Sequence, residues 1–260
     1  MSAPEAFAEL IQIMARLRRP GGCPWDREQT HQSIKPYLIE ETYEVIEAID
    51  ARDDAEFCAE LGDLLLQVVF HAEMASERGA FAIADVVRAI CDKLIRRHPH
   101  VFGDVAVKDA QEVLHNWSRI KAQERAHSDD ASALAGVPRG MPALLRAQRL
   151  GEKASRVGFD WQHTEDVLDK IQEELDELRA ACQLGDPGAA EAELGDLIYA
   201  ATNLARHLGV NAEDALSKTS DRFARRFRYI EEQLAAAGKD IRATPLSEQE
   251  ALWQEAKGRV

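Results

Sequence analysis

Residues 171–198 read IQEELDELRAACQLGDPGAAEAELGDLI. Apolar residues recur in this segment every three or four positions, which predicts two amphipathic helices. Gly185, Asp186 and Pro187 separate them, with the aspartate placed to cap the second helix and the proline to occupy its first turn. Because the connection is short, the two helices are expected to lie antiparallel to each other.

The same pattern occurs once more, 133 positions earlier in the chain. The segment EETYE at 40–44 corresponds to EELDE at 173–177, and AELGDL at 59–64 is identical to AELGDL at 192–197. A single acidic motif in a glutamate-rich helical protein would mean little. Two motifs repeated in the same order at the same separation indicate an internal duplication.

The rest of the chain has the same helical periodicity, broken by glycine and proline, and no segment alternates as a strand does. The sequence therefore predicts an all-α fold of two tandem helical-bundle domains. A stretch rich in Ser, Asp, Ala, Gly and Pro predicts a linker at 127–142, between domains at 1–126 and 143–260. Ser247 and Glu250 predict a capping box at the last helix. We expect helices over 4–18, 35–51, 54–78, 83–97, 108–125, 142–155, 165–184, 187–208, 212–237 and 248–257.

Composition limits the possible partners. The 260 residues include 32 Lys and Arg against 46 Asp and Glu, a net charge of −14. Such a chain repels a polyphosphate backbone, so binding to a nucleic acid polymer is not expected. Four cysteines without a CxxC motif predict reduced thiols in a cytoplasmic protein. A membrane span needs roughly 20 apolar residues, and no stretch of the sequence supplies them, so we expect no membrane contact.

The acidic motifs suggest a metal site. Glu174 and Glu177 share one helix face, and Glu193 and Asp196 share a face of the next helix at a similar distance from the turn. If the pairs converge, their like charges require a counter-charge. An all-oxygen ligand set favours Mg²⁺ or Mn²⁺ over Zn²⁺, and Mg²⁺ leaves positions for substrate phosphates. The alternative for each motif is a solvated acidic face, and helix rotation decides between the two.

Two glycines lie inside the predicted helices, Gly62 and Gly195. Glycine in a helix interior costs about 1 kcal/mol relative to alanine. Close approach of a neighbouring helix would explain why both positions tolerate it, so we expect tight helix packing there.

The chain resembles the MazG family of nucleoside triphosphate pyrophosphohydrolases, in the long form with two tandem copies. The resemblance covers nearly the whole chain and rests on both pairs of acidic motifs. It also rests on GCPWD at 22–26, RRHPHVF at 96–102 and VGFDW at 157–161. It implies all-α domains, dimerisation, Mg²⁺ dependence and hydrolysis of NTPs to NMP and diphosphate. Broad base tolerance and nucleotide-pool housecleaning follow from the same resemblance.

The resemblance assigns roles in the second copy, which is usually the catalytic copy in long-form relatives. Arg222 and Arg226, one helical turn apart, are expected to contact phosphates, although surface ion pairing is the alternative. Trp253, with Lys257 one turn later, is expected to stack on the nucleotide or, alternatively, to anchor the last helix. The expected site is Glu173 as catalytic or supporting residue; Glu174, Glu177, Glu193 and Asp196 as metal ligands; and Lys170, Arg222, Arg226, Trp253 and Lys257 as nucleotide- or phosphate-binding residues.

A second site in the first copy remains open, because that copy retains every acidic position. Trp117 and Lys121 there repeat the spacing of Trp253 and Lys257. The residues of this possible site are Glu40, Glu41, Glu44, Glu60, Asp63, Lys93 and Arg97.

Two other functions fit parts of the sequence. Glu28-x-x-His31 and Glu112-x-x-His115 match the ExxH motif of carboxylate-bridged di-iron bundles, but neither recurs in the other copy. A non-catalytic nucleotide-sensing or partner-binding scaffold is the other rival, and intact acids in both copies argue against it. One copy offers only two acid-bearing helices, so a four-helix arrangement predicts at least a homodimer.

Overall fold

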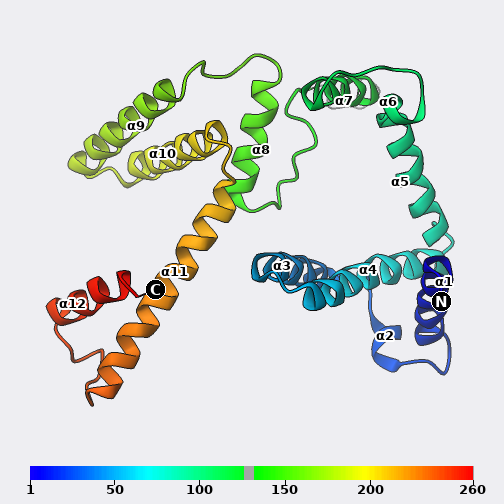
Figure 1. Cartoon of the computed structure of the whole chain (residues 1–260), viewed down its shortest axis with the longest axis horizontal. Coiled ribbons are helices and arrows are strands. Elements are labelled where there is room, and N and C mark those ends of the chain that lie inside the picture. The colour runs from blue at the N-terminus through cyan, green and yellow to red at the C-terminus, as the bar shows by residue number, and fades with distance from the viewer. Residues whose placement is uncertain (126–131, 260) are drawn as a thin grey trace. The chain divides into compact units, whose positions relative to one another are not determined.

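The computed structural model describes residues 1–125 and 132–259, apart from several side chains of the helix at 110–125. Most of the described residues lie in helices and none lies in a strand, which confirms the all-α prediction (Figure 1). The helices are α1 Ala3–Arg18, α2 Pro24–Glu28, α3 Lys35–Ala51, α4 Asp54–Glu77, α5 Ile83–Arg97, α6 Pro99–Phe102, α7 Ala110–Arg125, α8 Ala143–Ser155, α9 Thr164–Leu184, α10 Pro187–His207, α11 Ala212–Ala236 and α12 Leu246–Lys257.

The chain divides into two compact units, Met1–Trp117 and Ser118–Val260. This division falls inside α7, whereas the sequence predicts domain boundaries at 126 and 143. Part of the predicted linker lies outside the described residues, and its described part, 132–142, consists of turns and irregular structure. The linker limits therefore stay a prediction.

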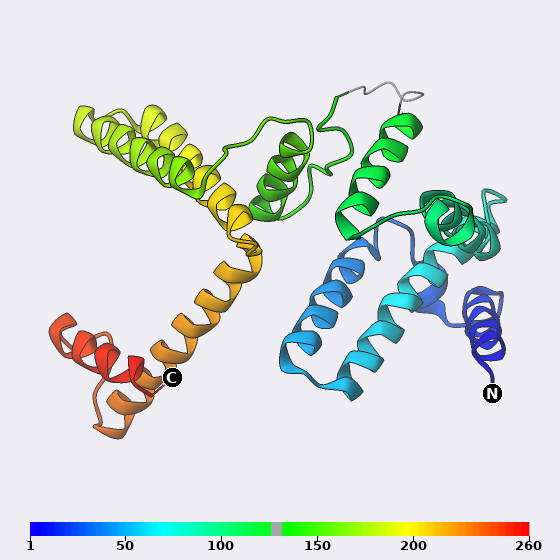
Figure 2. The same cartoon turned by 45° about the horizontal axis from the view of Figure 1, so that its top comes forward.

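The first unit is built around the antiparallel hairpin of α3 and α4 (Figure 2). Helix α1 packs across α4 and closes a small apolar core. An ion pair links the same two helices, with Arg18 Nε 2.6 Å from Glu77 Oε1. The buried core residues are Met14, Ile34, Val69, Phe70 and Met74.

The second unit contains the equivalent hairpin of α9 and α10, against which α8 packs. At Gly151 the helices approach so closely that an added Cβ would lie 2.6 Å from Asn203 Oδ1. The start of α11 bonds to α8, since Gln148 Oε1 accepts from the Ala212 amide at 2.9 Å. From there α11 runs away from the hairpin, and α12 folds back along it (Figure 1).

The two hairpins share their capping chemistry. Asp53 accepts hydrogen bonds from two amides at the start of α4, and Asp186 does the same at the start of α10. This confirms the cap predicted at Asp186 and extends the duplication to the turn. The residue before each aspartate has a positive φ, 58° at Arg52 and 67° at Gly185.

Two details of the sequence interpretation are wrong. The short helices α2 and α6 were not predicted, because a five-residue and a four-residue helix leave too little periodicity to detect. Helix α12 begins at Leu246 with Pro245 as its N-cap, so Ser247 lies within the helix and does not cap it. The N-cap position is set by where the chain leaves the loop, which a Ser-x-x-Glu spacing alone does not determine.

The cysteines are free in the structure, as the sequence predicts. Over the described ranges, every helix is too short or too polar to span a lipid bilayer.

Candidate active site

Three carboxylates converge on the α9–α10 hairpin. One oxygen from each of Glu174, Glu177 and Glu193 lies within 4.8 Å of the others. Glu174 is only 6% exposed, although carboxylates are seldom buried without a partner. Asp196, one turn after Glu193, lies outside this group of three among the described residues. Helix rotation therefore brings together three of the four predicted metal ligands.

A lysine compensates part of this negative charge. Lys170 Nζ lies 2.8 Å from Glu174 Oε1 and 2.8 Å from Glu173 Oε1. The hydrogen bond to Glu173, followed by the bond to Glu174, raises the pKa of Lys170, so the side chain stays cationic. Lys170 and Glu173, both predicted site residues, are thus placed at the edge of the carboxylate group.

The remaining charge is not fully balanced. Desolvation, and then the nearby charges of Glu193 and Glu174, raise the pKa of Glu177. When neighbouring negative charges raise the pKa of a carboxylate, a cation that binds between them stabilises its ionised form. The electrostatics therefore favour a cation beyond Lys170.

The first copy repeats the arrangement on α3 and α4. Oxygens of Glu41, Glu44 and Glu60 lie within 4.8 Å of one another. Desolvation raises the pKa of Glu41, and the charges of Asp63 and Glu44 add to this. Desolvation, and then the charge of Glu44, raise the pKa of Glu60. Glu40 is exposed beside this group, in the position that corresponds to Glu173.

Both carboxylate groups suit a hard divalent cation. Ligand oxygens of Mg²⁺ lie about 2.1 Å from the ion, so opposite ligands are about 4.2 Å apart. Oxygens within 4.8 Å of one another are close to that spacing and need only small side-chain movements to reach it. Neither group includes a histidine or a cysteine, and an all-oxygen set favours Mg²⁺, Mn²⁺ or Ca²⁺ over zinc.

The predicted phosphate-binding residues of the second copy form a separate group on α11 and α12. The Arg226 guanidinium lies 5.8 Å from the centre of the Trp253 ring. The Phe223 ring centre is 5.3 Å from that of Trp253. Arg222 donates to Thr219 Oγ1 at 3.0 Å, and Lys257 is exposed at the end of α12.

Trp253 thus anchors α12 to α11, as one of the two interpretations predicts, while it also keeps Arg226 beside an aromatic face. Because α11 runs away from the hairpin, the fold of this unit does not bring these residues to the carboxylates (Figure 1).

The first copy has a counterpart of this cationic group, and a matching run of six residues indicates it more strongly than the four-residue spacing of its two cations does. DKLIRR at 92–97 on α5 matches DRFARR at 221–226 on α11. The separation is 129 positions here and not 133, because α10 is three residues shorter than α4 and the connection that follows α10 is one residue shorter. Lys93 and Arg97 therefore correspond to Arg222 and Arg226. Trp117 packs edge-on against His98, with ring centres 4.9 Å apart. The side chain of Lys121 lies outside the described residues.

Of the two ExxH motifs, only Glu28-x-x-His31 has both side chains among the described residues, and it lies apart from the carboxylate groups. His31 lies next to another histidine, with its Nδ1 2.8 Å from His71 Nδ1 and the rings stacked. The carboxylate groups that suit a metal contain neither Glu28 nor His31. The side chain of His115 falls outside the described residues.

The motif at 157–161 has a structural role that the sequence did not reveal. Asp160 accepts two hydrogen bonds from the Arg206 guanidinium, one of them from Nη1 at 2.8 Å, and lies 3.1 Å from His207 Nε2. The bonds from Arg206 lower the pKa of Asp160. These contacts fasten the loop before α9 to the end of α10, and so hold the acid-bearing hairpin.

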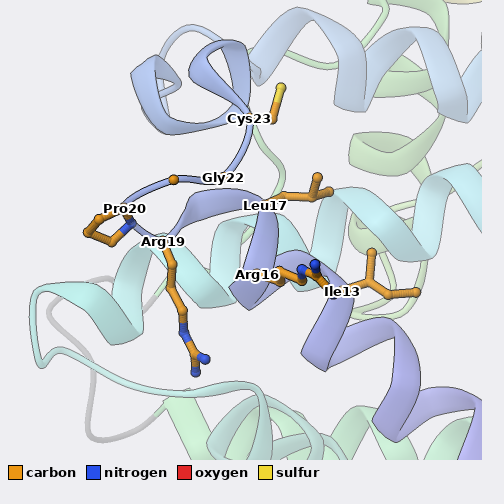
Figure 3. A pocket seen from close by; sticks show the side chains of 8 residues that line it. Ile13, Arg16, Leu17, Arg19, Pro20, Gly22 and Cys23 are labelled. Atoms are coloured by element: carbon orange, nitrogen blue, oxygen red, sulfur yellow. The ribbon is translucent and has the colours of Figure 1, made fainter.

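A pocket of about 480 Å³ lies at the turn after α1, near the motif at 22–26 (Figure 3). Gly22 fits tightly there, since an added Cβ would lie 2.2 Å from the Leu17 carbonyl oxygen. None of the lining residues is a carboxylate, so the pocket is separate from the candidate metal groups. Its walls are formed by Ile13, Arg16, Leu17, Arg19, Pro20, Gly21, Gly22 and Cys23.

The explanation expected for the helix-interior glycines is wrong for this chain's own helices. A Cβ added at Gly62 or Gly195 would meet nothing within 4 Å. Both glycines therefore border open space within the chain itself.

Comparison with known proteins identifies the family. Residues 29–102 match the MazG nucleotide pyrophosphohydrolase domain, and residues 148–223 match the phosphoribosyl-ATP pyrophosphohydrolase family. The chain is 49% identical over 251 residues to a nucleoside triphosphate pyrophosphohydrolase of Escherichia coli, covering 95% of each chain. The chain belongs to the MazG family.

Two further relatives support this membership. The MazG protein of Thermotoga maritima, named a nucleoside triphosphate pyrophosphohydrolase/pyrophosphatase, is 49% identical over 252 residues, which cover 97% of this chain and 96% of that protein. The protein YabN of Bacillus subtilis is 44% identical over 253 residues, but these cover 51% of its length. Each carboxylate group of this MazG-family chain lies in one of the two matched segments.

Proposed function

We propose that this protein hydrolyses nucleoside triphosphates to nucleoside monophosphates and diphosphate with Mg²⁺, which Mn²⁺ can replace. The observation that carries the proposal is the duplicated group of three converging carboxylates, one of them almost fully buried at Glu174. Family membership and the names of the relatives agree with it. Broad base tolerance, a role in nucleotide-pool housecleaning and a cytoplasmic location complete the proposal.

The second copy is the proposed principal site. Glu174, Glu177 and Glu193 would hold the metal, with Asp196 joining them or binding through water. A bound Mg²⁺ would polarise the phosphate oxygens and lower the pKa of a water molecule. Glu173 is exposed beside the group and is the proposed base, which would accept the proton of that water once Lys170 has moved away.

The cationic group on α11 and α12 would bind the triphosphate and the base. Arginine pairs with two phosphate oxygens at once, and an indole ring stacks on a base. Arg222, Arg226 and Lys257 thus serve the phosphates, while Trp253 serves the nucleoside. Lys93 and Arg97, with the acids of α3 and α4, would form a weaker second site.

A homodimer would unite the two groups. The hairpin exposes large apolar side chains, among them Leu194 at 48% and Ile198 at 46%, and α11 exposes Phe223 at 57%. Exposed apolar surface on facing helices favours association. We therefore propose that a second copy covers the hairpin and brings cationic residues to its carboxylates.

The activity is tested by incubation with Mg²⁺ and each NTP in turn, followed by separate assays of diphosphate and orthophosphate. Equal amounts of NMP and diphosphate are expected, and chelation by EDTA should abolish both products. Release of orthophosphate with NDP would reject the proposal, and no turnover of any NTP would favour a scaffold function.

Assembly is tested independently by light scattering at micromolar concentration. A mass of at least twice 29.0 kDa is expected. I198E places a charge on the apolar surface of the hairpin that is proposed to form the dimer interface. It should reduce the mass to that of one chain without loss of helicity. A single-chain mass for the unaltered protein would reject the dimer while leaving the activity to be judged by itself.

A further inference from the structure

Lys170 occupies an unusual position in the candidate site. It lies one helical turn before Glu174, and its ammonium group is bound to an oxygen of that residue at 2.8 Å. Glu174 is also the most buried of the three converging carboxylates. The lysine therefore binds the side chain on which a metal would depend most.

The first copy has no such lysine. The position that corresponds to Lys170, 133 residues earlier, is Tyr37. Its ring packs edge-on against Trp25, with ring centres 6.1 Å apart. Glu41, which corresponds to Glu174, has a neutral hydrogen-bond partner where Glu174 has the lysine: Gln67 Nε2 donates to Glu41 Oε1 at 3.4 Å. The two acid groups thus differ in whether a cation of the chain itself holds the central glutamate.

A divalent cation that bound this group would compete with Lys170 for the same oxygen of Glu174. Glu174 has few free directions because it is buried, so an ion that binds it must displace or crowd the ammonium group. Lysine has a flexible stem and a single point charge that can be re-aimed over several ångströms. An ammonium group released beside the metal ligands would find phosphate oxygens as its next partner.

We propose that Lys170 takes the place of the metal in the metal-free site by pairing with Glu174. When a divalent cation binds, Lys170 leaves Glu174 and pairs with the substrate phosphates. The inference rests on the proposed function of this site. Lys170 lowers the affinity for metal in the absence of nucleotide, and its contact with the phosphates restores that affinity when nucleotide is present. Metal and nucleotide are therefore bound cooperatively in the second copy, and Tyr37 leaves the first copy without this coupling.

The test measures Mn²⁺ affinity by electron paramagnetic resonance of free Mn²⁺, on full-length protein. K170M is made in an E41Q background, which disables the first acid group. Removal of a partly exposed ion pair should tighten Mn²⁺ binding about fivefold. K170R keeps the charge and should bind Mn²⁺ as the E41Q parent does. An unchanged or weaker affinity in K170M would overturn the proposal, because the lysine would then support the metal site or be irrelevant to it.

The reciprocal change guards against misfolding of K170M. Y37K, in an E174Q background, introduces the lysine into the first copy and should weaken Mn²⁺ binding there about fivefold. No effect of Y37K would count against the mechanism of competition.

Repeating the titrations with a non-hydrolysable ATP analogue measures the coupling. The analogue should tighten Mn²⁺ binding less in K170M than in its parent, and equal tightening would overturn the second half of the proposal. Since the first titrations contain no nucleotide, their outcome does not depend on whether the protein hydrolyses NTPs.

Discussion

The α3–α4 and α9–α10 hairpins are two versions of one unit. Both begin their second helix at a capping aspartate, and both bring three glutamates together at the same height. They differ in the cation beside the central glutamate, which only the second hairpin has among the described residues. They also differ in the turn, where Arg52 stands in place of Gly185. The duplication thus preserved the ligand geometry while the local electrostatics and the loop strain diverged.

The largest expected effect separates the two acid groups by activity. E174Q keeps the size of the side chain and removes one charged metal ligand, so NTP hydrolysis should fall by about 100-fold or more. The matched variant E41Q should retain a substantial fraction of the activity. Diphosphate release at saturating Mg²⁺ measures both. Equal loss in the two variants would show two working sites, and the reverse pattern would make the first copy the principal one.

The next effect concerns the ion pairs that fasten each hairpin. Asp160 and Arg206 have side chains only 27% and 13% exposed, so D160N leaves a nearly buried guanidinium short of its partner. The free energy of unfolding should fall by about 2 kcal/mol. E77Q, which removes the acid of the α1–α4 ion pair in the first unit, should lose about 1 kcal/mol or less, because the Arg18 guanidinium keeps its hydrogen bonds to the carbonyl oxygens of Asp26 and Gln29. Denaturant unfolding followed by circular dichroism measures both, and a larger loss in E77Q would contradict the comparison.

The same pair predicts a dependence on pH. Bonds from Arg206 lower the pKa of Asp160, so the folded state prefers the ionised form. The stabilisation is complete above the pKa of Asp160 in the unfolded chain, about 3.9. It is lost as the pH falls through that value towards the lower pKa of the folded state. Unfolding curves between pH 6 and pH 3, compared with those of D160N, should converge at low pH, and parallel curves would contradict the assignment.

The turns differ by a smaller amount. Arg52 has a φ of 58°, a left-handed conformation that costs a residue with a side chain about 1 kcal/mol. R52G should therefore stabilise the protein by up to about 1 kcal/mol, and G185R should destabilise it by a similar amount. Opposite shifts of the melting temperature in the two variants are the expected result. Shifts of the same sign would show that side-chain contacts, and not backbone strain, dominate the turn.

An effect of similar size is expected at the helix-interior glycines. A Cβ at Gly62 or Gly195 meets nothing within 4 Å in the chain itself, so alanine should add up to about 1 kcal/mol of helix stability. G62A and G195A are measured by thermal unfolding at low protein concentration. Destabilisation of either variant that grows with protein concentration would indicate that another copy packs against the glycine.

The helices, the duplication and the acidic motifs followed from local patterns in the chain. Helical periodicity and the cap at Asp186 depend on neighbours within one or two turns, so their positions agree closely with the structure. The sequence could also predict which acids share a helix face, since three- and four-residue spacings determine this; their roles as metal ligands stay a prediction.

Contacts between helices were decided only by the tertiary structure. Rotation of α9 against α10 gathers Glu174, Glu177 and Glu193 and leaves Asp196 outside their group. Packing also determines the ion pair between Lys170 and Glu174 and the ion pair between Arg206 and Asp160. The open space beside Gly195 depends on it as well. Sequence spacing specifies the face on which a residue lies, whereas the rotation and separation of two helices depend on how whole sets of side chains interlock. The hairpins could therefore be predicted from the sequence, whereas the charge balance of their sites could not.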